Sequence, residues 1–167
     1  MLLRVSRSET FTRLWGIPSS GGRGARAIEK NTLYKSMSDC ELVLRFFAIR
    51  ETISQNLRGS LRSLLDRCMK RHLNDTDNAA AEAEQQFLAC IDRLDSAFPD
   101  NPFKLPEGRL SRPLYDALMV ALSLNRSRVG SINDSAARRR LSRAITNAKQ
   151  YEILIGRGNT IDAIKDR

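Results

Sequence analysis

Histidine and paired cysteines are almost missing from this sequence. It contains one histidine, His72, and three cysteines, Cys40, Cys68 and Cys90, none of which forms a Cys-x-x-Cys pair. A single histidine excludes the usual His-rich zinc sites, although it leaves a pairing with a cysteine nucleophile open. Each cysteine falls among apolar residues at helical spacing, where cysteine acts as a small hydrophobic side chain. We therefore expect reduced core thiols, no metal site and no catalytic residue in this chain.

Long apolar runs are missing as well. No stretch approaches the roughly 20 residues that a helix needs to cross a bilayer. Arg4 and Arg7 interrupt the segment in which a secretory signal would need its apolar run. We expect neither secretion nor a membrane partner, and we place the protein in the cytoplasm. The Arg- and Ser-rich beginning leaves an organelle transit peptide open as the alternative, although no clear cleavage pattern follows it.

Glycine and proline are sparse, with 9 and 5 residues, and no segment alternates apolar and polar residues as a strand does. A chain of 167 residues, 41% of them hydrophobic, can bury one core. We predict an all-α fold, with a bundle of about five helices and a short C-terminal helix within residues 36–167. Residues 1–35 should form a flexible N-terminal arm and linker, because 19–30 combines Ser, Gly and Arg without apolar periodicity.

Apolar periodicity and capping residues place the helices. We expect five of them, at about 39–55, 60–73, 77–98, 113–124 and 133–150. Ser38 and Glu41 have the spacing of a capping box at the start of the first helix, and Thr160 should cap the short terminal helix. The first helix is apolar on nearly every side, so it should lie at the centre of the bundle. The fifth helix should turn Leu141 and Ile145 inward.

Arg45 lies in the middle of that central helix, among large apolar residues. A guanidinium removed from water costs several kcal/mol, roughly, unless a carboxylate, a phosphate or a set of carbonyls accepts its hydrogen bonds. Three carboxylates of the chain could be its internal partner: Glu41, Asp66 and Asp116. A bound phosphate or nucleotide is the alternative, because the planar fork of arginine suits either acceptor. Arg58 and Arg112, near helix ends or loops, could then widen the anion site.

The net charge of +9 is unevenly distributed. Residues 1–35 carry +5, 36–75 carry +2, 76–101 carry −5 and 102–167 carry +7. A basic body with a pI near 10.1 favours an anionic partner such as nucleic acid, while a solubilising surface is the alternative. Four arginines of the fifth helix are the candidate contacts to the DNA backbone: Arg138, Arg139, Arg140 and Arg143.

Five stretches of the chain resemble the helical half of the GmrSD-type proteins. They are 9–16 (ETFTRLWG), 40–48 (CELVLRFFA), 57–69 (LRGSLRSLLDRCM), 111–119 (SRPLYDALM) and 159–167 (NTIDAIKDR). The resemblance implies a phage-defence protein in which a ParB-like nuclease half, dependent on a nucleoside triphosphate, restricts invading DNA that often carries modified bases. The Asp-Gly-Gln-Gln-Arg motif of that half is absent, since the Gln85-Gln86 pair is followed by Phe87. The resemblance therefore implies the helical part alone, truncated or split from the catalytic half, with no cofactor in this chain.

Three functions remain open. The first is a helical partner domain or fragment that supports a ParB-like catalytic half or subunit, with Arg45, Arg58 and Arg112 facing DNA or nucleotide phosphate. The second is a stand-alone basic nucleic-acid-binding protein, although its connections are too long for a helix-turn-helix and no aromatic residues interleave with the basic ones. The third is an inactive interaction module or gene remnant, whose exposed apolar surface would cause self-association.

Overall fold

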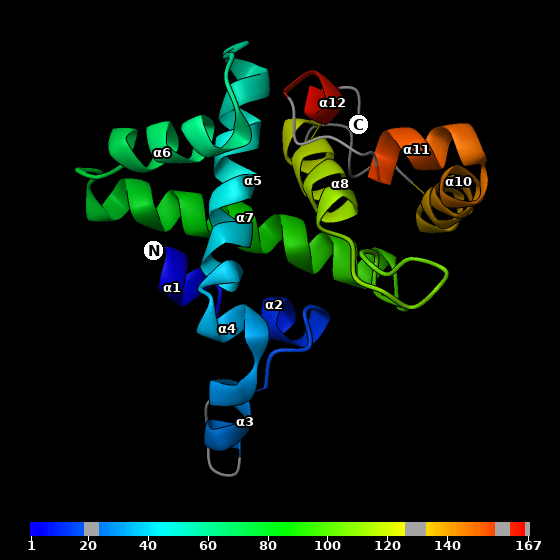
Figure 1. Ribbon diagram of the computed structural model, residues 1–167, viewed down its shortest axis with the longest axis horizontal. Coiled ribbons are helices and arrows are strands. Elements are labelled where there is room, and N and C mark those ends of the chain that lie inside the picture. The colour runs from blue at the N-terminus through cyan, green and yellow to red at the C-terminus, as the bar shows by residue number, and fades with distance from the viewer. Residues whose placement is uncertain (19–23, 126–132, 156–160, 166–167) are drawn as a thin grey trace.

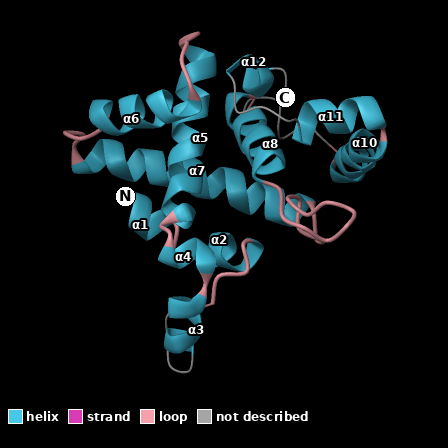
Figure 2. Cartoon of the chain, viewed as in Figure 1, coloured by secondary structure: helices cyan, strands magenta, loops and turns pink. Residues whose placement is uncertain are grey.

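The computed structural model describes residues 1–18, 24–125, 133–155 and 161–165. These residues form helices joined by loops and turns, without a strand, so the predicted all-α fold is confirmed (Figure 2). The described helices are α1 (Leu2–Val5), α2 (Glu9–Leu14), α3 (Gly24–Lys30), α4 (Thr32–Lys35), α5 (Ser38–Ser54), α6 (Leu61–Arg71), α7 (Asp77–Ala97), α8 (Arg112–Leu124), α10 (Asp134–Thr146), α11 (Ala148–Ile155) and α12 (Ile161–Lys165). None of these helices combines the length and the apolar character that a membrane crossing demands.

The helix α5 lies at the centre of the molecule, between α6 and α8 and across α7 (Figure 1). Its Leu42 and Phe46 are buried, as expected for a helix that is apolar on nearly every side. The predicted capping box at its start is wrong. The preceding residue, Met37, has a φ of 56° and makes no side-chain cap, and the Ser38 hydroxyl instead meets Ser36 Oγ at 2.8 Å.

Aromatic rings from several helices meet in the core. Phe46 of α5 and Phe87 of α7 pack edge to face, with ring centroids 5.3 Å apart. Phe11 of α2 lies 6.0 Å from Phe87, and Trp15 lies 5.4 Å from Tyr115 of α8 in another edge-to-face contact. Such pairs contribute roughly 0.5–1.5 kcal/mol each beyond the burial of their surface. Phe11 and Trp15 thus pack the N-terminal segment against α7 and α8.

The prediction of a flexible arm at 1–35 is therefore wrong for the described part of that range. Val5, Phe11 and Trp15 belong to the same buried cluster as α5 and α7, and Ile28 of α3 joins them. The helices α1 and α2 have four and six residues, too few for an apolar period to be visible in the sequence. Residues 19–23 of the expected linker lie outside the described residues.

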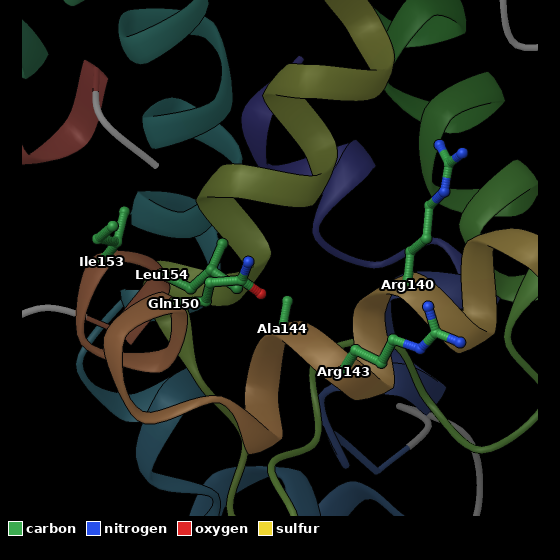
Figure 3. Close-up of a pocket in the computed structure, with 6 residues that line it drawn as sticks. All are labelled: Arg140, Arg143, Ala144, Gln150, Ile153 and Leu154. Carbon is green, nitrogen blue, oxygen red and sulfur yellow. The ribbon is translucent and has the colours of Figure 1, made fainter.

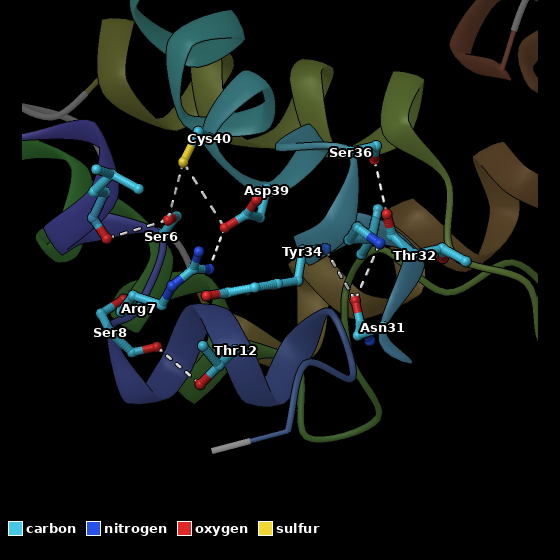
Figure 4. Close-up of polar contacts among 12 residues, drawn as sticks. Ser6, Arg7, Ser8, Thr12, Asn31, Thr32, Tyr34, Ser36, Asp39 and Cys40 are labelled. Carbon is cyan, nitrogen blue, oxygen red and sulfur yellow. Dashed lines mark hydrogen bonds and ion pairs between the residues drawn. The ribbon is translucent and has the colours of Figure 1, made fainter. Parts of the chain in front are cut away.

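Polar contacts fasten the N-terminal segment to the start of α5 (Figure 4). The Arg7 guanidinium forms an ion pair with the carboxylate of Asp39, which is completely buried, and lies 4.5 Å from the centre of the Tyr34 ring. The Ser6 hydroxyl is 3.4 Å from the Cys40 thiol. Because Asp39 stands in the first turn of α5, the positive end of the helix dipole also favours its charge.

The C-terminal region departs from the single helix expected at 133–150. Asn133 caps α10, but the helix ends at Thr146, and the extended backbone of Asn147 (φ −82°, ψ 117°) separates α10 from α11. α10 packs against α7 and α11, and α11 packs against α8. Leu141 and Ile145 are only half-buried, so α10 lies at the periphery. The helix α12 stands where a short one was expected, while its predicted cap, Thr160, lies outside the described residues.

Candidate functional site

Arg45 is 4% exposed and is paired inside the fold. Its Nε donates to Asp116 Oδ1 at 3.1 Å and its Nη2 donates to Oδ2, so the guanidinium and the carboxylate form a two-pronged pair between α5 and α8. Glu41, one turn earlier on α5, lies 3.8 Å from Nη1. Asp66 is exposed on α6 and is not within ion-pair distance of Arg45. The guanidinium therefore has an internal partner and needs no bound phosphate.

This pair forms a polar centre in the apolar core. Burial lowers the pKa of Arg45, but the hydrogen bond and charge of Asp116 outweigh it, so the pKa is raised overall. Burial also raises the pKa of the neighbouring Tyr115 hydroxyl well above its ordinary value, and the charge of Asp116 adds to the effect. The Tyr115 hydroxyl donates to the Leu42 carbonyl at 3.1 Å. Both contacts tie α8 to α5, which makes Arg45 a structural residue and not an anion site.

Arg58 and Arg112, the other two anion candidates, do not join Arg45 in one site. Arg112 opens α8 one turn before Asp116 and is half-buried. Arg58 is exposed and follows the far end of α5, which runs on for roughly 13 Å beyond Arg45 at 1.5 Å per residue. Its carbonyl accepts a hydrogen bond from Arg67 at 3.5 Å. Arg112 therefore belongs to the start of α8, and Arg58 belongs to the connection between α5 and α6.

The helix α10 exposes all four arginines that the sequence offered as backbone contacts: Arg138, Arg139, Arg140 and Arg143. At 100° per residue, Arg139, Arg140 and Arg143 fall within an arc of about 100°, and Arg138 stands outside it. We name these three residues the arginine face. The half-buried Leu141 and Ile145 occupy the opposite side of the helix. Amphipathic spacing therefore turns the three guanidinium groups outward.

No arginine of α10 forms an ion pair with a carboxylate of the described residues. Arg139 only donates to the Ser135 hydroxyl, at 3.3 Å. The acid that opens the helix, Asp134, is held by Arg93 of α7 at 2.5 Å, and this hydrogen bond lowers the pKa of Asp134. In contrast, surface arginines such as Arg4 and Arg13 reach carboxylates. Among the residues that the structure describes, the arginine face is thus left without a carboxylate partner.

Two residues of the arginine face border a cleft between α10 and α11 (Figure 3). Its volume is about 450 Å³, and its wall on α11 is formed by Gln150, Ile153 and Leu154. In Figure 3 Arg140 and Arg143 lie across from these side chains, with their guanidinium groups pointing away from Leu154. The cleft combines an apolar wall with a cationic rim, an arrangement suited to an anionic ligand that also has an apolar part.

A second cluster was missed by sequence reasoning. Glu51 of α5, Cys68 of α6 and His72, which caps α6, place their polar atoms within 4.8 Å of one another. Burial raises the pKa of the Cys68 thiol to about 12, and the charge of Glu51 adds to this. The thiol is therefore protonated at neutral pH, which excludes an activated Cys-His nucleophile. The signal in the sequence was the four-residue spacing of Cys68 and His72, which puts both on one helix face.

Comparison of the chain with models of protein families, with curated proteins and with solved structures returns no match.

Proposed function

We propose that this chain is a helical domain that binds the phosphate backbone of nucleic acid through the arginine face of α10. The observation that supports this most directly is that Arg139, Arg140 and Arg143 are exposed and form no ion pair with a carboxylate of the described residues. An exposed guanidinium keeps its planar fork of donors available, and the oxygens of a phosphate fit that fork. Each phosphate that is neutralised releases condensed counterions, which gives affinity independent of sequence.

The chemistry of the rest of the chain agrees with this function. The net charge of +9 attracts polyanions over distances comparable to the screening length. Cys40, Cys68 and Cys90 are buried thiols, as suits a reducing compartment, so we place this activity in the cytoplasm. In this proposal Arg45 has no part in the binding surface, because it is already paired with Asp116.

A charge-matched pair of variants tests the surface directly. Arg139→Gln/Arg140→Gln/Arg143→Gln should bind a random duplex DNA of about 20 base pairs roughly 100-fold more weakly at 0.1 M salt, because three phosphate contacts are lost. The matched control removes three arginines that already pair with Glu84, Asp95 and Glu107: Arg4→Gln/Arg13→Gln/Arg109→Gln. Fluorescence anisotropy should show near-native affinity for this control. Equal losses of affinity in the two variants would mean that binding depends only on net charge. That result would contradict the arginine face as the binding surface.

A second candidate is the role of helical partner to a ParB-like catalytic half that depends on a nucleoside triphosphate. It is favoured because three of the stretches that resemble GmrSD-type proteins fall on α5, α6 and α8, and both α6 and α8 pack against α5. The buried Arg45–Asp116 pair joins two of them. In this proposal the α10 surface faces the DNA that the catalytic half cleaves.

The partner role predicts a reading frame beside this one that encodes the Asp-Gly-Gln-Gln-Arg motif, and a complex of the two products. Co-expression followed by affinity capture of one product tests this. Recovery of the second product in equal amount supports the partner role. A locus without such a frame contradicts the split arrangement, and DNA binding by the chain alone then remains as the function. Self-association without DNA binding would favour an interaction module.

A further inference from the structure

We propose that Glu51, Cys68 and His72 form a binding site for a divalent transition-metal ion, with zinc as the best match. A carboxylate oxygen, the thiol sulfur and an imidazole nitrogen of these residues all lie within 4.8 Å of one another. The low histidine count of the sequence argued against a metal site, but the fold supplies the other donors. This site is separate from the arginine face, since α6 and α10 lie on opposite sides of the molecule (Figure 1).

The residue spacing on α6 and the packing of α6 against α5 bring the three donors together. Cys68 and His72 are four residues apart, one turn on the same face at the end of α6. That face packs against α5, where Glu51 stands in the last turn. Two donors therefore come from one helix end and the third from a neighbouring helix, so the packing of α6 on α5 sets the geometry of the site.

The donor set fits a borderline-soft metal. Zinc binds thiolate, imidazole and carboxylate at about 2.3, 2.0–2.1 and 2.0–2.2 Å, usually with four ligands in a tetrahedron. Neighbouring ligand atoms in such a tetrahedron are roughly 3.3–3.6 Å apart. His72 Nε2 and Glu51 Oε1 are now in hydrogen-bond contact, and an ion would replace the proton between them. Shifts of about 1 Å in side chains would bring the donors to these separations.

Neighbouring groups orient the donors as a second layer around a metal does. Asp75 Oδ2 lies 2.6 Å from His72 Nδ1, which leaves Nε2 directed at Glu51. A carboxylate on the far nitrogen of a ligating histidine fixes the tautomer and makes the ligand more basic. Arg71 Nη1 lies 3.3 Å from Glu51 Oε2 and 2.8 Å from Gln55 Oε1, so it holds the second oxygen of Glu51 and leaves Oε1 for an ion.

The charges of the site also balance. Glu51, Asp75 and a deprotonated Cys68 carry three negative charges, and Arg71 carries one positive charge, so a divalent cation makes the group neutral. Thiolate formation on binding releases the proton that the buried thiol now holds.

The donors border a cleft of about 580 Å³ that gives an ion and a fourth ligand access. Cys68 is 3% exposed and yet lines this cleft, whose apolar wall includes Leu44, Phe47 and Met69. Three protein ligands leave one tetrahedral position, which faces the cleft and can hold water or a small ligand. Zinc sites with this open position are the ones that bind exchangeable ligands.

Titration of the full chain, stripped with a chelator, tests the site with Co²⁺ as the probe and Zn²⁺ as the competitor. We expect one Co²⁺ per chain, the ligand-field bands of a tetrahedral ion, a thiolate-to-cobalt charge-transfer band, and displacement by one Zn²⁺. Cys68→Ser should remove the charge-transfer band. Glu51→Gln and His72→Gln should weaken binding by at least about 100-fold, and Asp75→Asn by about 10–100-fold.

Controls separate ligation from folding. Cys40→Ser and Cys90→Ser remove buried thiols outside the cluster and should leave the Co²⁺ spectrum and the affinity unchanged. Circular dichroism establishes that each variant is folded. If Cys68→Ser does not fold, Glu51→Gln and His72→Gln decide the question, because both side chains are partly exposed and tolerate replacement. A Co²⁺ complex without a thiolate band, or unchanged affinity in Glu51→Gln and His72→Gln, would overturn the site.

Discussion

A single buried arginine determines how the central helices meet. Arg45 and Asp116 stand 71 positions apart in the sequence, yet both are nearly fully buried and join through two hydrogen bonds. A buried pair of this kind gains little over apolar side chains of the same size, but either partner left alone is a buried unpaired charge. Its value lies in specifying that α8 packs on α5 in one register.

We predict that Arg45→Met or Asp116→Leu alone lowers the free energy of unfolding by about 3–5 kcal/mol, because each leaves the other charge buried and unpaired. The double variant Arg45→Met/Asp116→Leu should lose far less than the sum of the two. Urea denaturation followed by circular dichroism measures all three, with Arg112→Met, which removes a half-buried arginine of α8, as the control. Additive losses would show that the pair is not coupled.

A second residue-scale prediction concerns alkaline pH. Burial holds the pKa of Tyr115 well above its ordinary value of 10.0, so the folded state keeps its proton after the unfolded chain has lost it. This contribution to stability is fully present below pH 10 and is lost as pH rises above it, at about 1.4 kcal/mol per pH unit.

Tyr115→Phe lacks this titration. It should cost about 1 kcal/mol at neutral pH, where the hydrogen bond to the Leu42 carbonyl is lost, and this deficit should shrink from pH 10 upward. Stability curves of the two proteins from pH 7 to 11.5 test the point. Curves that stay parallel over this range would contradict it.

At the scale of elements, the longer helices were predictable and the short ones were not. The helices α6, α7 and α8 carry enough apolar turns for a clear period, and Ser60, Thr76 and Ser111 cap them. The helix α5 was recognisable instead because it is long and apolar on nearly every side. α1 and α2 are too short to show a period, and the break at Asn147 contains neither glycine nor proline. Their formation depends on tertiary packing, which a local pattern does not carry.

The candidate sites show the same division. The need of Arg45 for a partner followed from its apolar surroundings, but the choice of Asp116 over Asp66 depends on tertiary packing. Both α6 and α8 pack against α5, and only α8 turns its carboxylate inward, since Asp66 is exposed. The arginine face followed from the sequence because its members are close together on one helix. Glu51 and His72 are brought together by the contact of α5 with α6, so the sequence singled out His72 as a lone histidine but did not connect it with Glu51.

The turn before α6 gives a prediction for that element. Gly59 has a φ of +136°, a backbone conformation that residues with a side chain rarely adopt. A Cβ added at this position would lie 2.5 Å from Ser63 Oγ. We expect Gly59→Ala to lower the free energy of unfolding by about 1–3 kcal/mol. Thermal unfolding of Gly59→Ala, with Gly59→Ala/Ser63→Ala to separate the clash from the backbone strain, measures this. A stability equal to that of the unaltered protein would contradict it.

At the scale of the whole molecule, ion pairs redistribute the charge. The acidic segment 76–101 carries −5, and its Glu84 and Asp95 hold Arg4 and Arg13 of the N-terminal helices. The positive charge of residues 1–35 is thus partly neutralised within the fold, whereas residues 133–155, which form α10 and α11, hold five basic and only two acidic side chains. The arginine face therefore lies in a described segment with a net positive charge.

The dependence of duplex binding on salt tests the central claim most directly. If Arg139, Arg140 and Arg143 each contact a phosphate, the plot of log affinity against log salt should be steeper for the unaltered protein than for Arg139→Gln/Arg140→Gln/Arg143→Gln by about 2.7, or 0.9 per contact. Arg4→Gln/Arg13→Gln/Arg109→Gln should run parallel to the unaltered protein. A flat plot, or equal slopes with and without the arginine face, would contradict nucleic-acid binding through α10.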